Sequence, residues 1–164
     1  MEGRANVALF QRILHPTDFS SASLAAFERA IELAEHHGAD LLLLHVVDDP
    51  FLVETSGLKR DAATRIERQL HELRQRCRCG CEALAIEIGP PAETIVWYAW
   101  QQKCDLIVMG THGRTGMTHA YLGSIAERVI RRAMCPVFVV RPVAPDEPPP
   151  EKPELTYAPP RMFI

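Results

Sequence analysis

Residues 105–114 read Asp105-Leu106-Ile107-Val108-Met109-Gly110-Thr111-His112-Gly113-Arg114, and the chain continues to Gly123-Ser124. The apolar, β-branched run before the first glycine predicts a buried strand, and residues 125–132 carry apolar side chains at helical spacing. A strand therefore leads through a glycine-rich loop into a helix. In this arrangement loop amides and a helix N-terminus face the same anion, and glycine lets the backbone approach it without a Cβ in the way. The stretch predicts a phosphate-binding loop.

The rest of the chain repeats this alternation of strand and helix. Further strands are predicted at residues 12–15, 41–47, 82–88 and 137–140. A first helix, capped by Asp18, Ser20 or Ser21, ends at Gly38, and further helices are predicted at about residues 58–76 and 92–102. Residues 41–47 are apolar throughout, as in strands covered on both faces, whereas residues 82–88 alternate, as in a strand at the edge of a sheet.

The order of these elements, β-α-β-α-β-α-β-α-β, predicts the fold class and the position of a site. Alternating strands and helices with continuously apolar strands form an α/β, doubly wound parallel sheet with helices on both faces. Right-handed crossovers leave few topologies, of which the five-stranded order 3-2-1-4-5 fits best. That order places the first and fourth strands side by side. The loops at residues 16–20 and 110–124 would then face each other across one crevice at the carboxyl ends of the strands.

Length and composition exclude several classes of function. The chain has 164 residues, a net charge of −3 and a pI near 6.2, so it forms about one domain and has no basic field for nucleic acid. No apolar run approaches the roughly 18 residues that span a bilayer, and residues 1–10 lack the apolar core of a signal peptide. Five cysteines, an odd number, favour reduced thiols. We therefore expect a cytoplasmic protein that binds neither nucleic acid nor membrane.

The composition changes after Arg141. Residues 142–164 contain eight prolines, with four acidic residues among them: Asp146, Glu147, Glu151 and Glu154. Such a segment predicts an extended tail rather than a packed element. The end of the tail, residues 157–164, is apolar enough to contact a protein partner. We therefore divide the chain into a folded domain, residues 1–141, and a proline-rich tail, residues 142–164.

Four segments outside the loop resemble landmarks of the universal stress protein family, in the same order and at the same spacing. They are Ile13-Leu14-His15-Pro16-Thr17-Asp18-Phe19-Ser20, Leu43-Leu44-His45-Val46-Val47-Asp48, Asp105-Leu106-Ile107-Val108-Met109-Gly110 and Pro136-Val137-Phe138-Val139-Val140. The spacing Gly110-x2-Gly113-x9-Gly123-Ser124 is similar to the nucleotide-binding signature of that family. The resemblance covers about residues 11–141. It implies a flavodoxin-like or Rossmann-like nucleotide-binding domain that binds ATP and forms a homodimer through its fifth strand.

The resemblance also implies a role for particular residues. Asp18 would bond the ribose, while Pro16 and Thr17 would shape the adenine end of the site. The backbone of Val46 would meet adenine, and Met109 and Gly110 would line the pocket for adenine and ribose. Backbone N–H groups and one hydroxyl would hold the phosphates, and these come from Gly113, Arg114, Gly123, Ser124 and Ile125. Mg²⁺ bound with the phosphates is left open, and no metal site built by the protein alone is expected.

Several of these residues also have simpler explanations. Ser124 and Glu127 match the S-x-x-E capping box, which explains both residues without a ligand. Asp18 fits a helix cap as well as a ribose contact. His45 lies within an apolar strand and is expected to be a core histidine with satisfied hydrogen bonding. None of these explanations accounts for the glycines of the loop.

Two further features are assigned to structure rather than to ligand binding. Trp97 and Trp100 lie three residues apart on a predicted helix and are expected to help cover the sheet. The cluster Cys77-x-Cys79-x-Cys81 lacks the C-x2-C spacing of zinc sites, so we expect a structural or redox-sensitive group of thiols there.

The sequence lacks the motifs of common nucleotide-dependent enzymes. It has no G-x4-G-K-[ST] loop, no G-x-S-x-G elbow and no G-x-G-x-x-G fingerprint. No catalytic residue is therefore assigned and no fast ATPase is expected, while slow hydrolysis or self-phosphorylation stays open. We favour an ATP-binding stress-response and signalling module. The alternative is a non-catalytic dimeric interaction protein that works through its sheet edge or its tail without nucleotide.

The fifth predicted strand favours a dimer on its own. An apolar strand at the edge of a sheet invites pairing with another chain. We therefore expect residues 137–140 to pair antiparallel with the same residues of a second copy, across a twofold axis.

Overall fold

The computed structural model describes residues 8–54, 57–78, 81–111 and 122–142, so the predicted tail lies outside the described residues apart from Pro142. The strands of the main sheet are β1 (Arg12–Pro16), β2 (Asp40–Val47), β5 (Cys81–Ile88), β6 (Leu106–Gly110) and β7 (Val137–Val140). The helices are α1 (Ser21–His37), α2 (Arg60–Arg76), α3 (Pro91–Gln101) and α4 (Ser124–Arg132). Between β2 and α2 lie a 3-10 helix, η1 (Pro50–Leu52), and a small hairpin of β3 (Val53–Glu54) and β4 (Gly57–Leu58).

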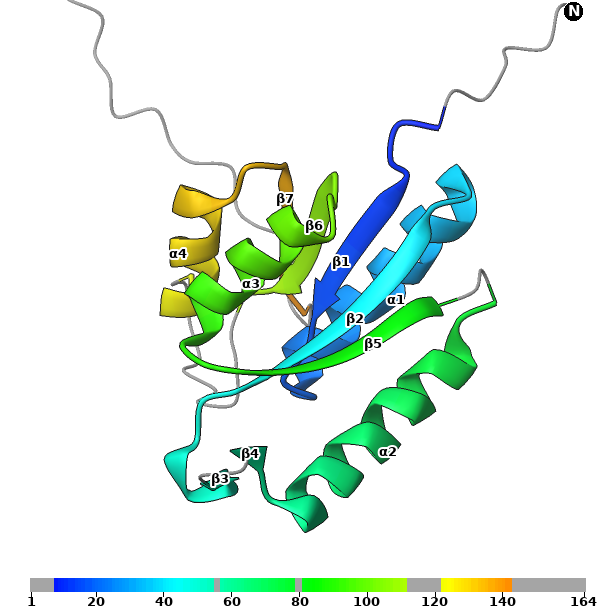
Figure 1. Cartoon of the computed structure of the whole chain (residues 1–164). Coiled ribbons are helices and arrows are strands. Elements are labelled where there is room, and N and C mark those ends of the chain that lie inside the picture. Colours follow the sequence, from blue (N-terminus) through cyan, green and yellow to red (C-terminus); the bar gives the residue numbers. More distant parts are fainter. Residues whose placement is uncertain (1–7, 55–56, 79–80, 112–121, 143–164) are drawn as a thin grey trace, which may run out of the picture.

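The five strands of the main sheet are parallel and lie in the order β5-β2-β1-β6-β7 (Figure 1). Numbered along the chain within this sheet, the order is 3-2-1-4-5, so the predicted topology is confirmed. β1 and β6 are neighbours at the point where the strand order reverses. β5 lies at one edge of the sheet, as its alternating sequence predicts, and β7 lies at the other.

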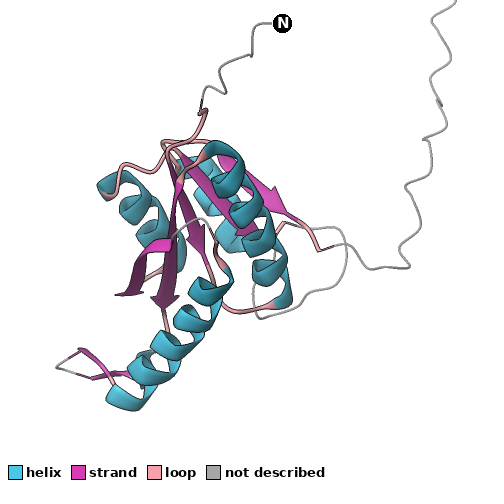
Figure 2. Cartoon of the chain, turned by 90° about the vertical axis from the view of Figure 1, so that its right-hand side faces the viewer, coloured by secondary structure: helices cyan, strands magenta, loops and turns pink. Residues whose placement is uncertain are grey.

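Helices cover both faces of the sheet (Figure 1, Figure 2). On one face α1 and α2 pack into a core that includes Phe27 and Leu70, and α3 and α4 pack into a second core on the other face. Successive residues of a strand point to opposite faces, so Ile13 of β1 belongs to the first core and Leu14 to the second. Both faces of the central strands are therefore buried, which explains why their sequences are apolar throughout.

The ends of α1 follow from its sequence. Ser20 is the N-cap, and its hydroxyl accepts a hydrogen bond from the N–H of Ser23 at 3.3 Å. Gly38 follows the last turn with a φ of 64°, the left-handed conformation that glycine adopts without strain, and its N–H donates to the carbonyl of Ala34. Of the three capping residues that the sequence leaves open, the structure selects Ser20.

The start of α2 differs from the prediction by two residues. The helix begins at Arg60 rather than near residue 58, because Leu58 pairs with Val53 in the β3–β4 hairpin. Five apolar side chains at helical spacing are expected to face the core. Ala62, Ile66, Leu70 and Leu73 are buried, whereas Leu58 lies in the hairpin and is half-buried.

The tryptophans of α3 do not cover the sheet, so that prediction is wrong. Trp97 and Trp100 are 47% and 63% exposed. The face of α3 that is buried carries smaller or flatter side chains instead, namely Ala92, Ile95, Tyr98 and Ala99. The alanines let the helix lie close to the sheet, and the two indoles are left on the outer surface.

Candidate functional site

The predicted site residues come from the ends of three neighbouring strands (Figure 1). They are Val46 near the end of β2, Pro16, Thr17 and Asp18 at and after the end of β1, and Met109 and Gly110 at the end of β6. Ligands of doubly wound sheets bind outside the carboxyl ends of the strands, where the strand order reverses. The topology therefore brings these residues to the carboxyl ends of the strands, where a ligand is expected.

The turn after β1 is held by its own side chains. Oδ1 of Asp18 accepts hydrogen bonds from the N–H of Ser20 at 3.0 Å and from its hydroxyl at 2.6 Å. The hydroxyl oxygen of Thr17 accepts from the N–H of Phe19 at 3.1 Å and from the hydroxyl of Ser23 at 2.8 Å. Phe19 lies in the left-handed region, with a φ of 64°. A bulky residue in that region is strained, and such strain occurs where the surrounding contacts fix a turn.

The main-chain ladder between β1 and β6 stops where the site begins. Its register ends with Leu14 opposite Ile107. The next hydrogen bond of the ladder would run from the N–H of residue 16 to the carbonyl oxygen of Val108. It cannot form, because Pro16 has no N–H. Nδ1 of His15 lies 2.8 Å from that carbonyl oxygen and replaces the missing donor. The two strands therefore separate without leaving this carbonyl unpaired.

His15 is neutral and donates through Nδ1. A carbonyl cannot donate, so the bond to Val108 places the ring proton on Nδ1 and leaves a lone pair on Nε2. The ring is fully buried against Phe27, with 5.4 Å between centroids, and Nε2 has no hydrogen-bond partner in the described part of the chain. Burial lowers the pKa of His15 from 6.5 to about 4, although the bond to Val108 and the charge of Asp18 act in the opposite direction. The imidazole is therefore uncharged at neutral pH.

A second buried histidine ties β2 to the same turn. Nδ1 of His45 lies 2.7 Å from the carbonyl oxygen of Thr17, and the ring of Phe19 stacks on the imidazole with centroids 4.8 Å apart. The N–H of Thr17 donates to the carbonyl of Leu44 at 2.8 Å. The prediction that His45 is a hydrogen-bonded core histidine is thus confirmed. His15 and His45 together join the ends of β6, β1 and β2 through side chains.

Gly110 brings the start of the glycine loop against α1. A Cβ at this position would lie 2.8 Å from both the carbonyl carbon and the carbonyl oxygen of Ala22, in the first turn of the helix. Those atoms belong to the backbone and cannot rotate away, so only glycine fits. The end of β6 and the N-terminus of α1 consequently lie side by side.

The two ends of the glycine loop are tied together. The N–H of Gly123 donates to the carbonyl of Thr111 at 2.8 Å, and the N–H of Thr111 donates to the carbonyl of Val140 at 3.0 Å. The start of α4 is therefore held at the carboxyl end of β6. Gly113 and Arg114 belong to residues 112–121 and lie outside the described residues.

The N-terminus of α4 differs from the capping-box interpretation. Gly123 is the N-cap, so Ser124 is the first helical residue and Glu127 the fourth. A capping box needs serine at the N-cap itself, so this interpretation is wrong. Among the described residues no side chain caps the helix, and Ser124 and Ile125 are exposed. The first N–H groups of a helix have no acceptor within it, and here they are available to an anion.

Several of the predicted site residues have buried side chains, since Pro16 is buried and Thr17 is only 5% exposed. The side chain of Met109 is buried in the core beneath α3 and α4, and Val46 is half-buried against the same core. Sequence reasoning assigned no role to Phe19 or Ser23, because only the observed φ and the bond to Thr17 reveal one. For His15 a signal was present, since a proline follows it directly at the end of a strand.

Metal and thiol chemistry has little support in the described residues. No group of three or more His, Cys, Asp or Glu side chains among them could hold a metal ion. Of the predicted thiol group, Cys77 is half-buried, while Cys79 and the side chain of Cys81 lie outside the described part. Burial raises the pKa of the Cys104 thiol to about 12, so this thiol is protonated at neutral pH.

No helix among the described residues is both long and apolar enough to cross a membrane.

Several known proteins resemble this chain in sequence and in fold. The model of the universal stress protein family matches residues 9–141. Universal stress protein MJ0531 of Methanocaldococcus jannaschii is 38% identical over 141 residues, covering 81% of this chain and 83% of the relative. The structure of protein MJ0577 from the same organism has a TM-score of 0.72 at 29% identity, covering 82% of this chain and 97% of that one. A universal stress protein solved in complex with cAMP has a TM-score of 0.62 at 26% identity, covering 80% of this chain and 97% of its own.

Proposed function

This chain belongs to the universal stress protein family, and from that premise we propose that it is an ATP-binding module of stress response and signalling. The relative solved with cAMP supports an adenine nucleotide as the ligand. The glycine spacing Gly110-x2-Gly113-x9-Gly123-Ser124 supports ATP, with Mg²⁺ on its phosphates. The sequence lacks the motifs of a fast ATPase, so the bound nucleotide would change the conformation or the partners of the protein rather than turn over rapidly.

The convergence of three strand ends with both ends of the glycine loop carries this proposal. Adenine would lie against Pro16 and Thr17 and the backbone of Val46. The ribose would bond Asp18, whose carboxylate is oriented by the N–H and hydroxyl of Ser20. The backbones of Met109 and Gly110 would form the wall on the side of β6.

The phosphates would lie at the N-terminus of α4. The first N–H groups of that helix carry a partial positive charge, and no side chain of the described residues caps them. Gly123, Ser124 and Ile125 would contribute backbone N–H groups and one hydroxyl. Gly113 and Arg114 are proposed to complete the phosphate site from within the loop.

A direct test identifies what the purified protein carries. The full chain is denatured, and any released nucleotide is identified by chromatography and mass spectrometry. ATP at about one per chain would support the proposal. An empty protein would be titrated calorimetrically with Mg-ATP, ADP and cAMP. Flat titrations with all three would reject nucleotide binding and favour the alternative of an interaction protein that works without nucleotide.

We also propose that the protein is a homodimer through β7. This strand is an edge of the sheet and pairs with β6 on one side. Phe138 on β7 is 50% exposed and Met134 just before the strand is 81% exposed. Antiparallel pairing with a second copy would satisfy the open edge and cover Phe138.

We also propose that the chain has two parts and works in the cytoplasm. Residues 1–141 would form the nucleotide-binding domain, and residues 142–164 would form a tail that contacts a protein surface. The odd number of five cysteines supports a reducing, cytoplasmic environment.

A further inference from the structure

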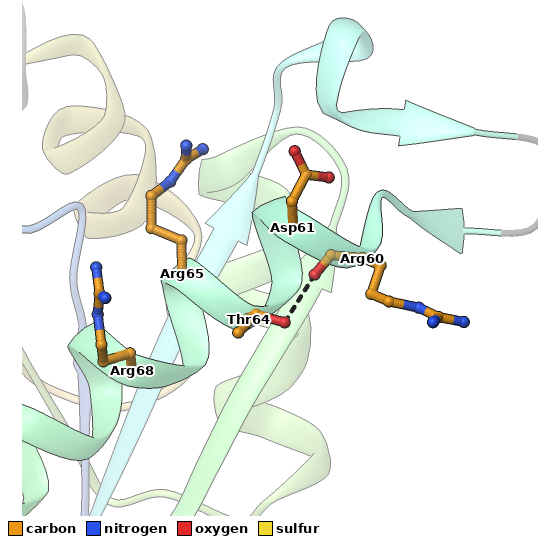
Figure 3. Close-up of a pocket in the computed structure, with 5 residues that line it drawn as sticks. All are labelled: Arg60, Asp61, Thr64, Arg65 and Arg68. Atoms are coloured by element: carbon orange, nitrogen blue, oxygen red, sulfur yellow. Dashed lines mark hydrogen bonds between the residues drawn. The ribbon is translucent and has the colours of Figure 1, made fainter.

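A hollow of about 530 Å³ lies along the first half of α2 (Figure 3). It is lined by five residues of this helix, namely Arg60, Asp61, Thr64, Arg65 and Arg68. Figure 3 shows Arg65 and Arg68 pointing to the same side of the helix, together with Asp61, whereas Arg60 points away from them. On the side that Arg65, Arg68 and Asp61 share, two positive charges stand against one negative charge, a net +1. The hollow is therefore suited to an anionic occupant.

The arginines of this hollow have no ion-pair partner among the described residues. Several other arginines of the protein do, and their pairs are Arg29–Glu32, Arg76–Glu28, Arg131–Glu127 and Arg132–Glu93. Arg65 lies one helical turn after Asp61, yet no ion pair forms between the two. The guanidinium groups of Arg65 and Arg68 are thus available to carboxylates from elsewhere.

The chain has a segment of matching opposite charge. Residues 146–154 read Asp146-Glu147-Pro148-Pro149-Pro150-Glu151-Lys152-Pro153-Glu154, which is four acids against one lysine, a net −3. Four prolines in nine residues favour an extended polyproline II backbone. A proline-rich sequence of this kind loses little conformational entropy when it binds in a polyproline II conformation.

The topology places the hollow and the start of the tail on the side of the sheet where the strands have their carboxyl ends. β7 and β2 are parallel, so their carboxyl ends lie on the same side. The end of β7 leads into the tail, and the end of β2 leads to α2. Four strand spacings separate β7 from β5, and at about 4.8 Å each they amount to about 19 Å. Residues 142–151 span about 30 Å in a polyproline II conformation. This reach exceeds the lateral separation of β7 from β5, and α2 packs against β5 and β2.

We propose that residues 146–154 bind to the first half of α2 in the same chain, with their carboxylates on Arg65 and Arg68. The planar guanidinium group matches a carboxylate with two parallel hydrogen bonds. Each exposed ion pair is weak, but the tether gives the segment an effective concentration on the order of millimolar.

The test measures the order of the tail in the full chain. Heteronuclear ¹⁵N NOE values of residues 146, 147, 151, 152 and 154 are recorded at 20 mM and 500 mM NaCl. We expect restricted motion at low salt and free-chain values at high salt, because salt screens exposed charges. Values that already equal those of a free chain at low salt would overturn the proposal. Values that rise with protein concentration would assign the contact to a second copy and overturn binding within one chain.

Charge-reversal variants locate the contact on α2. Arg65→Glu is expected to release the segment at low salt, and adding Glu151→Arg to it is expected to restore part of the order. Arg74→Glu is the matched control, because Arg74 is exposed on the same helix but lies in its last turn. It makes the same change in net charge and is expected to leave the NOE values unchanged. Equal loss of order in Arg65→Glu and Arg74→Glu would show a general charge effect and contradict a site at the hollow.

Discussion

Gly110 ends β6 directly against the backbone of Ala22, in the first turn of α1, and no side chain fits between them. Gly110→Ala places a methyl group 2.8 Å from the Ala22 carbonyl, so the strand end and the helix must move apart. We expect urea unfolding to show a loss of about 1–3 kcal/mol, together with weaker nucleotide binding.

Gly38→Ala is the control for this substitution. Gly38 has a φ of 64°, but a Cβ added there would meet no atom within 4 Å, so an alanine costs about 1–2 kcal/mol through backbone strain alone. It lies at the far end of α1 and is expected to leave binding unchanged. If both variants bind nucleotide as the wild type does, the close approach of Gly110 to α1 has no role in the site.

The buried histidine of β1 makes stability depend on pH. The folded pKa of His15 is about 4, below the ordinary value of 6.5, because the ring is buried. Above pH 6.5 the ring is neutral in both the folded and the unfolded chain, and its contribution to stability is complete. As the pH falls from 6.5 towards 4, only the unfolded chain takes up the proton, so stability is lost. The shift corresponds to about 3 kcal/mol over this range.

His15→Asn tests this dependence. The asparagine amide has a donor near the position of Nδ1 and does not titrate, so the bond to Val108 is retained without the proton uptake. We expect the variant to lose less stability than the wild type between pH 7 and pH 4.5, measured by urea unfolding. His15→Leu removes both the titration and the hydrogen-bond donor. At pH 7 its free energy of unfolding is expected to be about 1–3 kcal/mol below that of His15→Asn, because the Val108 carbonyl is left unpaired. Identical pH dependence in the wild type and His15→Asn would rule out the neutral buried imidazole.

The turn after β1 depends on a buried hydroxyl of α1. Ser23 is 4% exposed, and its hydroxyl donates to Thr17 at 2.8 Å. We expect Ser23→Ala to lower the free energy of unfolding by about 1 kcal/mol. Ser21→Ala is the control, since Ser21 is exposed at the start of the same helix, and it is expected to stay within about 0.5 kcal/mol of the wild type. Equal effects in the two variants would show that the bond to Thr17 does not stabilise the turn.

The order of the main elements could be predicted because each long helix repeats its apolar spacing several times and each buried central strand is a short, continuous apolar run. The β3–β4 hairpin could not, since strands of two residues are too short to show any period. The orientation of α3 was missed because Trp97 and Trp100 have helical spacing, but Ile95 and Tyr98 have the same spacing and face the sheet. Spacing alone does not say which of two apolar stripes is buried.

The candidate site could be located from sequence more fully than its internal contacts. The strand order and the glycine spacing place Asp18 and Gly110 together at the carboxyl ends of β1 and β6. The bond from His15 to Val108 joins residues 93 positions apart, and it follows only once β1 and β6 are known to be neighbours. The N-cap of α4 was misassigned by one residue, because glycine and serine both occupy that position readily.

Ser124→Asp separates phosphate binding from folding. A carboxylate in the first turn of α4 stabilises the helix by complementing its dipole, but it repels a phosphate bound at the same N–H groups. We expect roughly tenfold or more weaker binding of Mg-ATP by calorimetry, with a melting temperature equal to or above that of the wild type. Ser124→Ala is the control at the same position, since it removes the hydroxyl alone and is expected to bind only a few-fold less tightly. Unchanged affinity in Ser124→Asp would mean that the phosphates lie elsewhere.

The dimer proposed for β7 depends on Phe138, which is half-exposed on the open edge of the sheet. Phe138→Lys places a charge where two apolar edges would meet, and lysine on an edge strand opposes pairing. We expect sedimentation velocity at micromolar concentration to show a dimer for the wild type and a monomer for Phe138→Lys, with unchanged circular dichroism. Trp100→Lys is the control, because Trp100 is 63% exposed but lies on α3 rather than on the edge, and it is expected to remain dimeric. A wild-type monomer would exclude the proposed dimer, and a monomer for Trp100→Lys alone would move the interface from β7 to α3.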